Sequence, residues 1–218
     1  MLVGHLGVGL IGQRLEPKIS LGTWILAVTL ADLVFFPLSI LRIERFHAEA
    51  GVAQNRFVGD IPFSHSLLMD AIWGALFGGV YFAIRRNRRG AWLLLGAVLS
   101  HWVLDVTSHR PDMQIAPGIN ATLGFGLWNS IPATIAVEGG LWALGIAIYL
   151  RSTRTRGVAG IVVFWAGVAF LTLAWWGNLH RGMDPNPVRA GVSGLILFSL
   201  VVAWAYWVNR IRTARPAA

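Results

Sequence analysis

The chain has 218 residues, of which 56% are hydrophobic and 13% are charged, and it contains no cysteine. This composition is typical of an integral membrane protein and leaves no stretch for a sizeable soluble domain. Without cysteine there is no disulfide framework, no thiolate metal site and no cysteine nucleophile. The net charge of +8 comes from arginines that cluster beside apolar segments. Clusters of that kind orient membrane helices, so we expect no nucleic-acid partner.

Six apolar segments approach the length of about 20 residues that a helix needs to cross a bilayer. They are residues 21–41, 63–84, 91–107, 128–150, 157–177 and 188–208. Residues 1–11 are apolar but cover only about half a span, which favours a re-entrant or interfacial helix that stays on the mature protein. The sequence therefore predicts an all-α fold, a polytopic membrane helical bundle of about six transmembrane helices plus this N-terminal helix, with residues 1–218 as one domain.

The positive charges alternate between the predicted connections. Four segments, at residues 14–18, 85–89, 151–156 and 210–215, carry 12 of the 18 Lys and Arg residues. With six spans these segments lie on one side of the membrane, and the positive-inside rule places that side in the cytoplasm. We therefore expect a multi-pass membrane protein with both termini in the cytoplasm.

The most informative stretch is SHWVLDVTSHRPD at residues 100–112. Its His101, Asp105 and His109 are spaced four apart and so share one face of a helix. Ionisable groups in hydrocarbon are costly, and they usually line a bundle interior where they carry metal, protons or substrate. A His/Asp pair at this spacing can also hold two helices together through a hydrogen bond. The stripe alone leaves both interpretations open.

Other ionisable residues reach a similar depth in the membrane. Asp32 and His101 lie about ten residues into their spans from the cytoplasmic side, or about 15 Å deep. His65 stands at the outer end of its span, Glu138 lies mid-span, and His5 reaches the same level if the first segment enters the bilayer. The partners that cost least for such groups are each other or a shared cation.

Several motifs occur in an order that resembles a known family. They are GHLGVG at 4–9, LAD at 30–32, SHSLL at 64–68 and HWVLD at 101–105. In this order they resemble bacterial inner-membrane proteins identified as membrane-bound metal-dependent hydrolases, the LexA-binding type included. The chain is also similar to a large uncharacterised branch of that group, through PFSHSLL, the 100–112 stretch, GFGLWNS at 124–130 and VEGGLWALGIAIYLR at 137–151. The likeness covers residues 1–151, and the two spans within 157–208 are additional.

The resemblance implies a location in the bacterial inner membrane and a set of metal ligands. Carried over by position, these ligands are His5, Asp32, His65, His101 and Asp105. The sequence departs from the better-known members in two places, because it lacks both a D-x-D pair in the first span and a His-Arg pair before Ser64. His109 and Glu138 are the residues that would compensate, and the alternative is a branch without catalysis.

The chemistry of these residues suits a divalent metal held by nitrogen and oxygen. Zn²⁺ fits such a set, with Mn²⁺ or Fe²⁺ as alternatives. We expect His65, His101 and Asp32 to bind the ion directly, and Asp105 either to bind it or to orient a histidine. Glu138 and Asp105 are the catalytic candidates, with Glu138 as the possible general base.

These expectations predict a hydrolase that acts on a lipid-like or phosphorylated substrate from the outer face of the membrane. Two other classes stay open. The buried carboxylates and the His101 stripe suit an ion- or proton-coupled transporter. The same groups would also suit a non-catalytic membrane protein in which they only pack.

Overall fold

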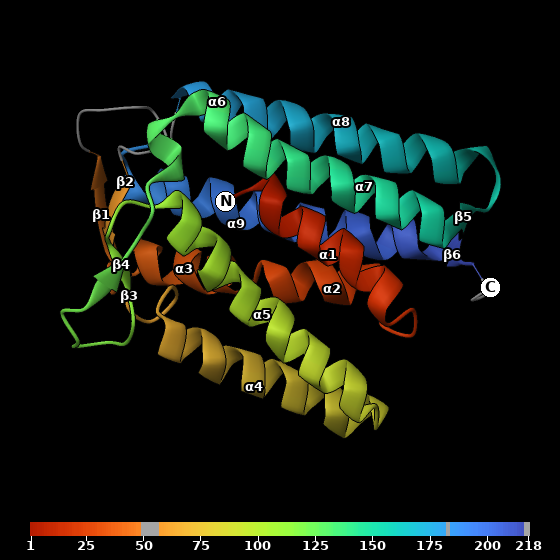
Figure 1. Ribbon diagram of the computed structural model, residues 1–218, viewed down its shortest axis with the longest axis horizontal. Helices are drawn as coiled ribbons and strands as arrows, with labels where there is room; N and C mark the ends of the chain where they lie inside the picture. The colour runs from red at the N-terminus through yellow and green to blue at the C-terminus, as the bar shows by residue number, and fades with distance from the viewer. Residues whose placement is uncertain (49–56, 182–183, 216–218) are drawn as a thin grey trace.

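Most helices of the protein run along the long axis of one bundle (Figure 1). The computed structural model describes residues 1–48, 57–181 and 184–215. Within them, five helical segments are long and apolar enough to cross a membrane: α4 (Leu67–Arg85), α5 (Arg88–Ser108), Ile131–Ser152, α8 (Gly157–Arg181) and α9 (Pro187–Ile211). The third comprises α6 (Ile131–Thr134), the π-helix η3 (Ile135–Gly139) and α7 (Gly140–Ser152). The predicted all-α membrane bundle is confirmed.

The sixth predicted span is broken in its middle. Residues 21–41 form α2 (Leu21–Val28) and α3 (Leu30–Ile40), which meet at an angle of 53°. At the break, Thr29 has φ −112° and ψ 10°, and its hydroxyl donates to the Ile25 carbonyl at 2.7 Å. A threonine that bonds back to the preceding turn bends a helix. The break places Asp32 in the first turn of α3, where a carboxylate is stabilised by the helix dipole.

The N-terminal helix α1 (Val3–Leu15) lies inside the bundle, against α7, α2 and α5. Its length of 13 residues matches the predicted half-span, and His5, Leu6 and Leu10 are almost fully buried. Close approach to α7 depends on glycine. A Cβ added at Gly145 would lie 2.5 Å from the Gly7 carbonyl oxygen, closer than side chains are found to backbone. The burial of α1 favours the re-entrant helix over the interfacial one, because an interfacial helix would leave one face in contact with lipid headgroups.

The two ends of the bundle differ in structure and charge. The hairpin of β1 (Arg45–Ala48) and β2 (Phe57–Asp60) and that of β3 (Met113–Gln114) and β4 (Thr122–Leu123) lie at one end (Figure 1). At the other end β5 (Thr153–Thr155) pairs with β6 (Arg212–Ala214). The four basic segments gather at this second end, here called the basic end. Their common position is the arrangement that the alternating charges predicted.

A buried apolar core separates the basic end from the middle of the bundle. Leu6, Leu10, Leu21, Ile25 and Phe164 belong to one buried apolar cluster and are each at most 1% exposed. Helix α9 packs against both α2 and α3, so the two C-terminal spans are part of the same bundle. The polar residues described next therefore lie on the far side of this core from the basic end.

Candidate metal centre

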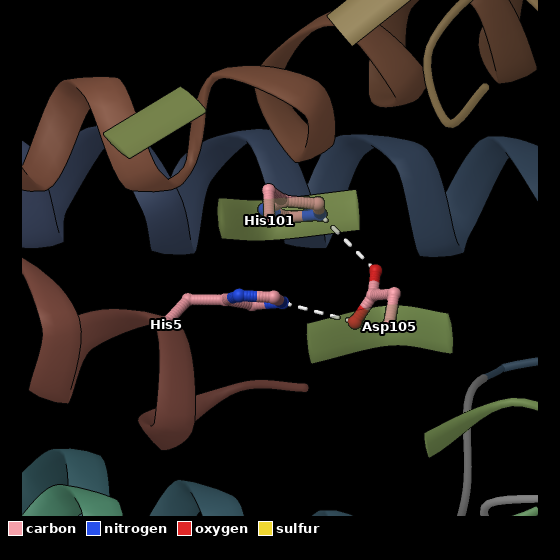
Figure 2. Close-up of side chains that lie close together, drawn as sticks. All are labelled: His5, His101 and Asp105. Carbon is pink, nitrogen blue, oxygen red and sulfur yellow. Dashed lines mark hydrogen bonds and ion pairs between the residues drawn. The ribbon is translucent and has the colours of Figure 1, made fainter. Parts of the chain in front are cut away.

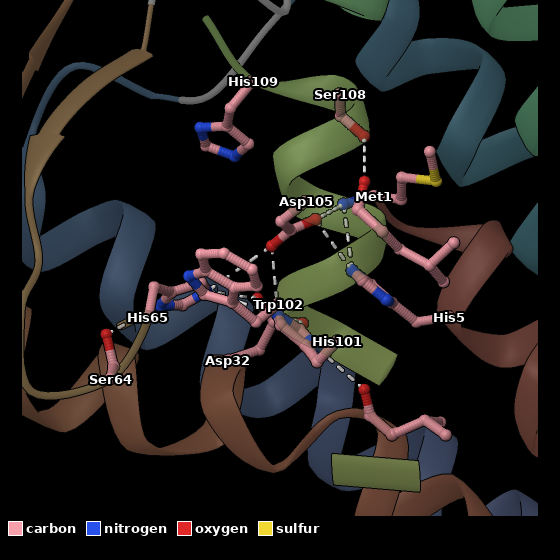
Figure 3. A network of polar contacts seen from close by, with 12 residues as sticks. Met1, His5, Asp32, Ser64, His65, His101, Trp102, Asp105, Ser108 and His109 are labelled. Carbon is pink, nitrogen blue, oxygen red and sulfur yellow. Dashed lines mark hydrogen bonds and ion pairs between the residues drawn. The ribbon is translucent and has the colours of Figure 1, made fainter. Parts of the chain in front are cut away.

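Five of the residues selected from the sequence converge on one buried site (Figure 3). His5 comes from α1, Asp32 from the first turn of α3, His65 from the turn before α4, and His101 and Asp105 from α5. The three histidines and Asp105 are at most 6% exposed, and Asp32 is half-buried. Two overlapping groups offer ligand atoms within 4.8 Å of one another: His5, His101 and Asp105, and Asp32, His65 and His101.

The distances between donor atoms match those of a small metal-binding site. Nε2 of His101 lies 3.3 Å from Nε2 of His65 and 3.2 Å from Oδ2 of Asp105. The Asp32 carboxylate lies 3.7 Å from His65 Nε2 and 4.0 Å from His101 Nε2. Ligands bound tetrahedrally at about 2.0–2.1 Å are separated by about 3.3 Å, so a shared ion needs only small adjustments of these side chains.

The helix break fixes the tautomer of His101. Its Nδ1 lies 2.8 Å from the carbonyl oxygen of Val28, the last residue of α2. A carbonyl only accepts hydrogen bonds, so Nδ1 carries the proton and donates it. In the neutral ring Nε2 then has the lone pair, and this atom faces His65 and Asp105. Ligating histidines are commonly oriented through their other nitrogen in this way.

A second chain of hydrogen bonds fixes His65. Oγ of Ser64 donates to Oε2 of Glu44 at 2.6 Å, so it accepts from Nδ1 of His65 at 2.7 Å. Oε1 of Glu44 also accepts the backbone N–H groups of Phe63 and Ser64, at 2.7 and 2.8 Å. The Glu44 carboxylate thus accepts from three donors and acts only as an acceptor here. In a neutral His65 ring, the proton is therefore on Nδ1 and the lone pair is on Nε2.

Asp105 connects the two halves of the site. Oδ2 faces His101, while Oδ1 lies 3.0 Å from Nε2 of His5 (Figure 2). The His5 ring stacks on the His101 ring, with centroids 3.9 Å apart and planes 8° from parallel. The amino group of Met1 also contacts Oδ1 of Asp105 and lies 3.0 Å from Nε2 of His5. With Oδ1 paired in this way, Oδ2 remains directed at the two other histidines.

The structure places His109 and Glu138 away from these donor groups. His109 caps the end of α5, where its Nδ1 lies 3.2 Å from Oδ1 of Asp112 and its ring lies 4.5 Å from that of Trp128. Glu138 is fully buried in η3, and its Oε1 accepts the backbone N–H groups of Leu2 and Gly4. Glu138 thus caps the N-terminus of α1, which satisfies amide groups that otherwise lack partners.

A cavity of about 140 Å³ opens beside the donor atoms. Its polar wall includes Asp32, His65, Asp105 and His109, and its apolar wall includes the aromatic rings of Phe35, Phe36 and Phe198. Asn178 of α8 and Phe198 of α9 both contribute, so the two additional spans help to close the site. The volume admits several water molecules or a small reacting group next to the histidines.

Sequence reasoning missed three groups. Glu44 lies outside the predicted spans with no motif around it, and only its position beside the Ser64–His65 pair in the fold reveals a role. The break between α2 and α3 leaves the Val28 carbonyl free to accept from His101. The apolar pattern of residues 21–41 does not predict that break. Asp70 of α4 is fully buried, and neither of its oxygens has a hydrogen-bond partner among the described residues. The sequence offered one indication of this residue, namely that Asp70 lies five residues after His65.

Comparison with protein-family models, with curated proteins and with solved structures finds no match to this chain. The site is therefore interpreted from its own geometry. That geometry provides a buried His/Asp group in a membrane helical bundle that could hold a metal ion.

Proposed function

We propose that the protein is a metal-dependent hydrolase of the bacterial inner membrane, with the basic end and the C-terminus in the cytoplasm and, unlike the position expected from the sequence, the Met1 amino group buried at the site. The observation that carries the proposal is the pair of Nε2 atoms of His65 and His101, which lie 3.3 Å apart with carboxylates on either side. At this separation either a proton or a metal ion lies between the two nitrogens, and the surrounding carboxylates favour a cation at that point. Buried charges and polar groups require such a partner, because burial without one is costly.

His65, His101, Asp32 and Asp105 would hold the ion, and Zn²⁺ fits this donor set, with Mn²⁺ or Fe²⁺ as alternatives. When bound, a divalent ion supplies Lewis-acid activation of water and of an ester or phosphoryl oxygen. The residues of the chain keep both imidazoles in the ligand tautomer and hold the carboxylates in place. His109, whose Nδ1 faces Asp112, is the histidine in the cavity wall that would exchange protons with the reacting groups.

The surroundings favour a substrate with an apolar part. The three phenylalanine rings form one side of the cavity, while polar groups form the other. A membrane lipid carrying an ester or phosphoester presents both characters at one point. The site also lies beyond the apolar core as seen from the basic end, which together with the positive-inside rule supports a position in the outer half of the membrane.

A proton relay is the second candidate, and the continuous chain from Glu44 through Ser64 and His65 to His101 favours it. A relay across the membrane, however, needs polar groups over its full thickness. Between His5 and the basic end, the buried cluster around Leu6 and Leu10 interrupts such a path. We therefore favour the hydrolase.

The proposal is tested by assaying the purified protein in detergent on a lipid phosphomonoester, a lipid phosphodiester and a carboxylic ester. We expect hydrolysis of at least one, loss of activity on dialysis against a chelator, and recovery with one of the three ions. Asp32→Asn should lower the rate at least tenfold, because it removes one charged donor while keeping the shape. Protein that is fully loaded with metal and hydrolyses none of the three would refute the hydrolase.

A further inference from the structure

A second concave region lies at the basic end, between α2, α4 and α9. It is a groove of about 560 Å³. None of its lining residues belongs to the cavity beside the metal centre. Sites for small molecules commonly have volumes of about 300–1,000 Å³. The groove therefore has room for a ligand of its own.

The mouth of the groove is positively charged. Lys18, in the loop between α1 and α2, and Arg85, at the end of α4, both line it. Both are exposed, and neither side chain forms an ion pair or a hydrogen bond within the described parts of the chain. Arg89 nearby differs, because it donates to the Leu15 carbonyl and lies 3.9 Å from Glu16. No acidic side chain lines the groove among the described residues.

Neutral polar groups stand just below these cations. Oγ1 of Thr23 lies 2.7 Å from Oγ of Ser20 and 3.2 Å from the hydroxyl of Tyr206. Asn209 uses its Oδ1 to accept the backbone N–H of Leu21, which leaves its amide nitrogen as a donor in the wall. Hydroxyl and amide groups of this kind suit the ester and glycerol oxygens of a lipid.

The lower part of the groove is apolar and open to the side. Leu26 and Phe77 line it, and Val80 and Ile84 on α4 are 59% and 72% exposed. From Arg85 to Phe77 the helix rises about 12 Å, so the apolar wall continues from the membrane surface toward the hydrocarbon. An acyl chain can enter this space sideways from the bilayer.

We propose that this groove binds one anionic phospholipid from the leaflet at the basic end. Lys18 and Arg85 would hold the phosphate, the hydroxyl groups would meet the glycerol region, and an acyl chain would lie along α4. Charge complementarity selects an anionic headgroup, because a zwitterionic one leaves the pair of cations partly uncompensated. Basic pockets between transmembrane helices on the cytoplasmic side bind anionic headgroups on the same principle. This inference is independent of the metal centre.

The test is native mass spectrometry of the full chain in detergent, titrated with dioleoylphosphatidylglycerol or dioleoylphosphatidylcholine. We expect one phosphatidylglycerol molecule to stay bound at concentrations where phosphatidylcholine does not. The double variant Lys18→Gln/Arg85→Gln should weaken that binding about thirtyfold, the size expected for two cations near a charged headgroup. The control Arg151→Gln/Arg156→Gln removes the same charge at the same end and should stay within about twofold.

Two results would overturn the proposal. One is equal retention of the two lipids by the wild-type chain, and the other is equal loss of phosphatidylglycerol in the groove variant and in the control. Because both groove residues are exposed, the variants should unfold at the wild-type temperature. If the double variant cannot be purified, Arg85→Gln alone provides the comparison, with an expected weakening of about fivefold. Inorganic phosphate added as competitor should not displace the lipid, because it lacks the acyl chain.

Discussion

Replacing Glu44 by Gln should reverse the hydrogen bonds that orient His65. In the wild-type chain Oε1 of Glu44 accepts two backbone N–H groups, and Oε2 accepts the hydroxyl hydrogen of Ser64. Gln keeps one oxygen, which the two N–H groups require, so its NH₂ group faces Ser64. The Ser64 hydroxyl then accepts from Gln and donates to Nδ1 of His65. The proton of His65 moves to Nε2, which loses its lone pair for the metal.

The expected loss of metal affinity follows from the general effect of residues that orient a ligating histidine without touching the metal. Residues that orient a ligating histidine typically contribute 10–100-fold to metal affinity. We therefore expect Glu44→Gln to weaken Zn²⁺ binding by about 10–100-fold, or about 1.4–2.7 kcal/mol. Competition with a chromophoric chelator measures the affinity in detergent. Nitrogen chemical shifts of ¹⁵N-labelled histidine report the tautomer directly.

Ser66→Ala is the matched control, because Ser66 is the neighbouring buried serine and caps α4 by accepting from the Met69 N–H. Its loss should cost about 1 kcal/mol of stability and leave metal affinity unchanged. If Glu44→Gln binds Zn²⁺ as tightly as the wild-type chain, the proposed chain of hydrogen bonds does not control His65.

Three further predictions address the site, the packing and the topology. Metal should dissociate as the pH is lowered from 8 to 5, since protons compete for the imidazole nitrogens; an affinity that is flat over that range would argue against histidine ligands. Gly145→Ala should lower stability by about 1–3 kcal/mol, because its Cβ meets the Gly7 carbonyl, whereas Gly79→Ala meets nothing within 4 Å and should be harmless in the same thermal melt. Reporter fusions after Arg89 should report cytoplasm and a fusion near Gly118 periplasm; the opposite result at Gly118 contradicts the six-span orientation.

The bundle was predictable because each apolar segment is long enough to cross the membrane and because arginines mark alternate connections. The convergence of His5, Asp32, His65, His101 and Asp105 was also predictable, since ionisable groups at one depth need each other as partners. The break at Thr29 was not, because a single threonine in an apolar run carries no strong signal. Glu44 was missed for a related reason: its role arises from contact with a residue twenty positions later.

The placement of Glu138 depended on the same kind of long-range contact. The mid-span position of Glu138 suggested a general base. Whether its side chain faces the cavity or another helix depends on how α7 packs against α1. The Gly7–Gly145 contact draws the two helices together and brings the start of α1 to Glu138. Sequence periodicity shows that a residue is buried, while the neighbour it meets is decided by such packing.

The central claim is that a divalent ion binds between His65 and His101. Elemental analysis of protein purified without chelator tests it most directly, with His101→Ala beside a control, His180→Ala, whose histidine lies on α8 and bonds the Trp176 carbonyl. We predict close to one equivalent of Zn²⁺, Mn²⁺ or Fe²⁺ in the wild-type and His180→Ala proteins, and none in His101→Ala. Wild-type protein that stays metal-free after incubation with each ion would contradict the claim.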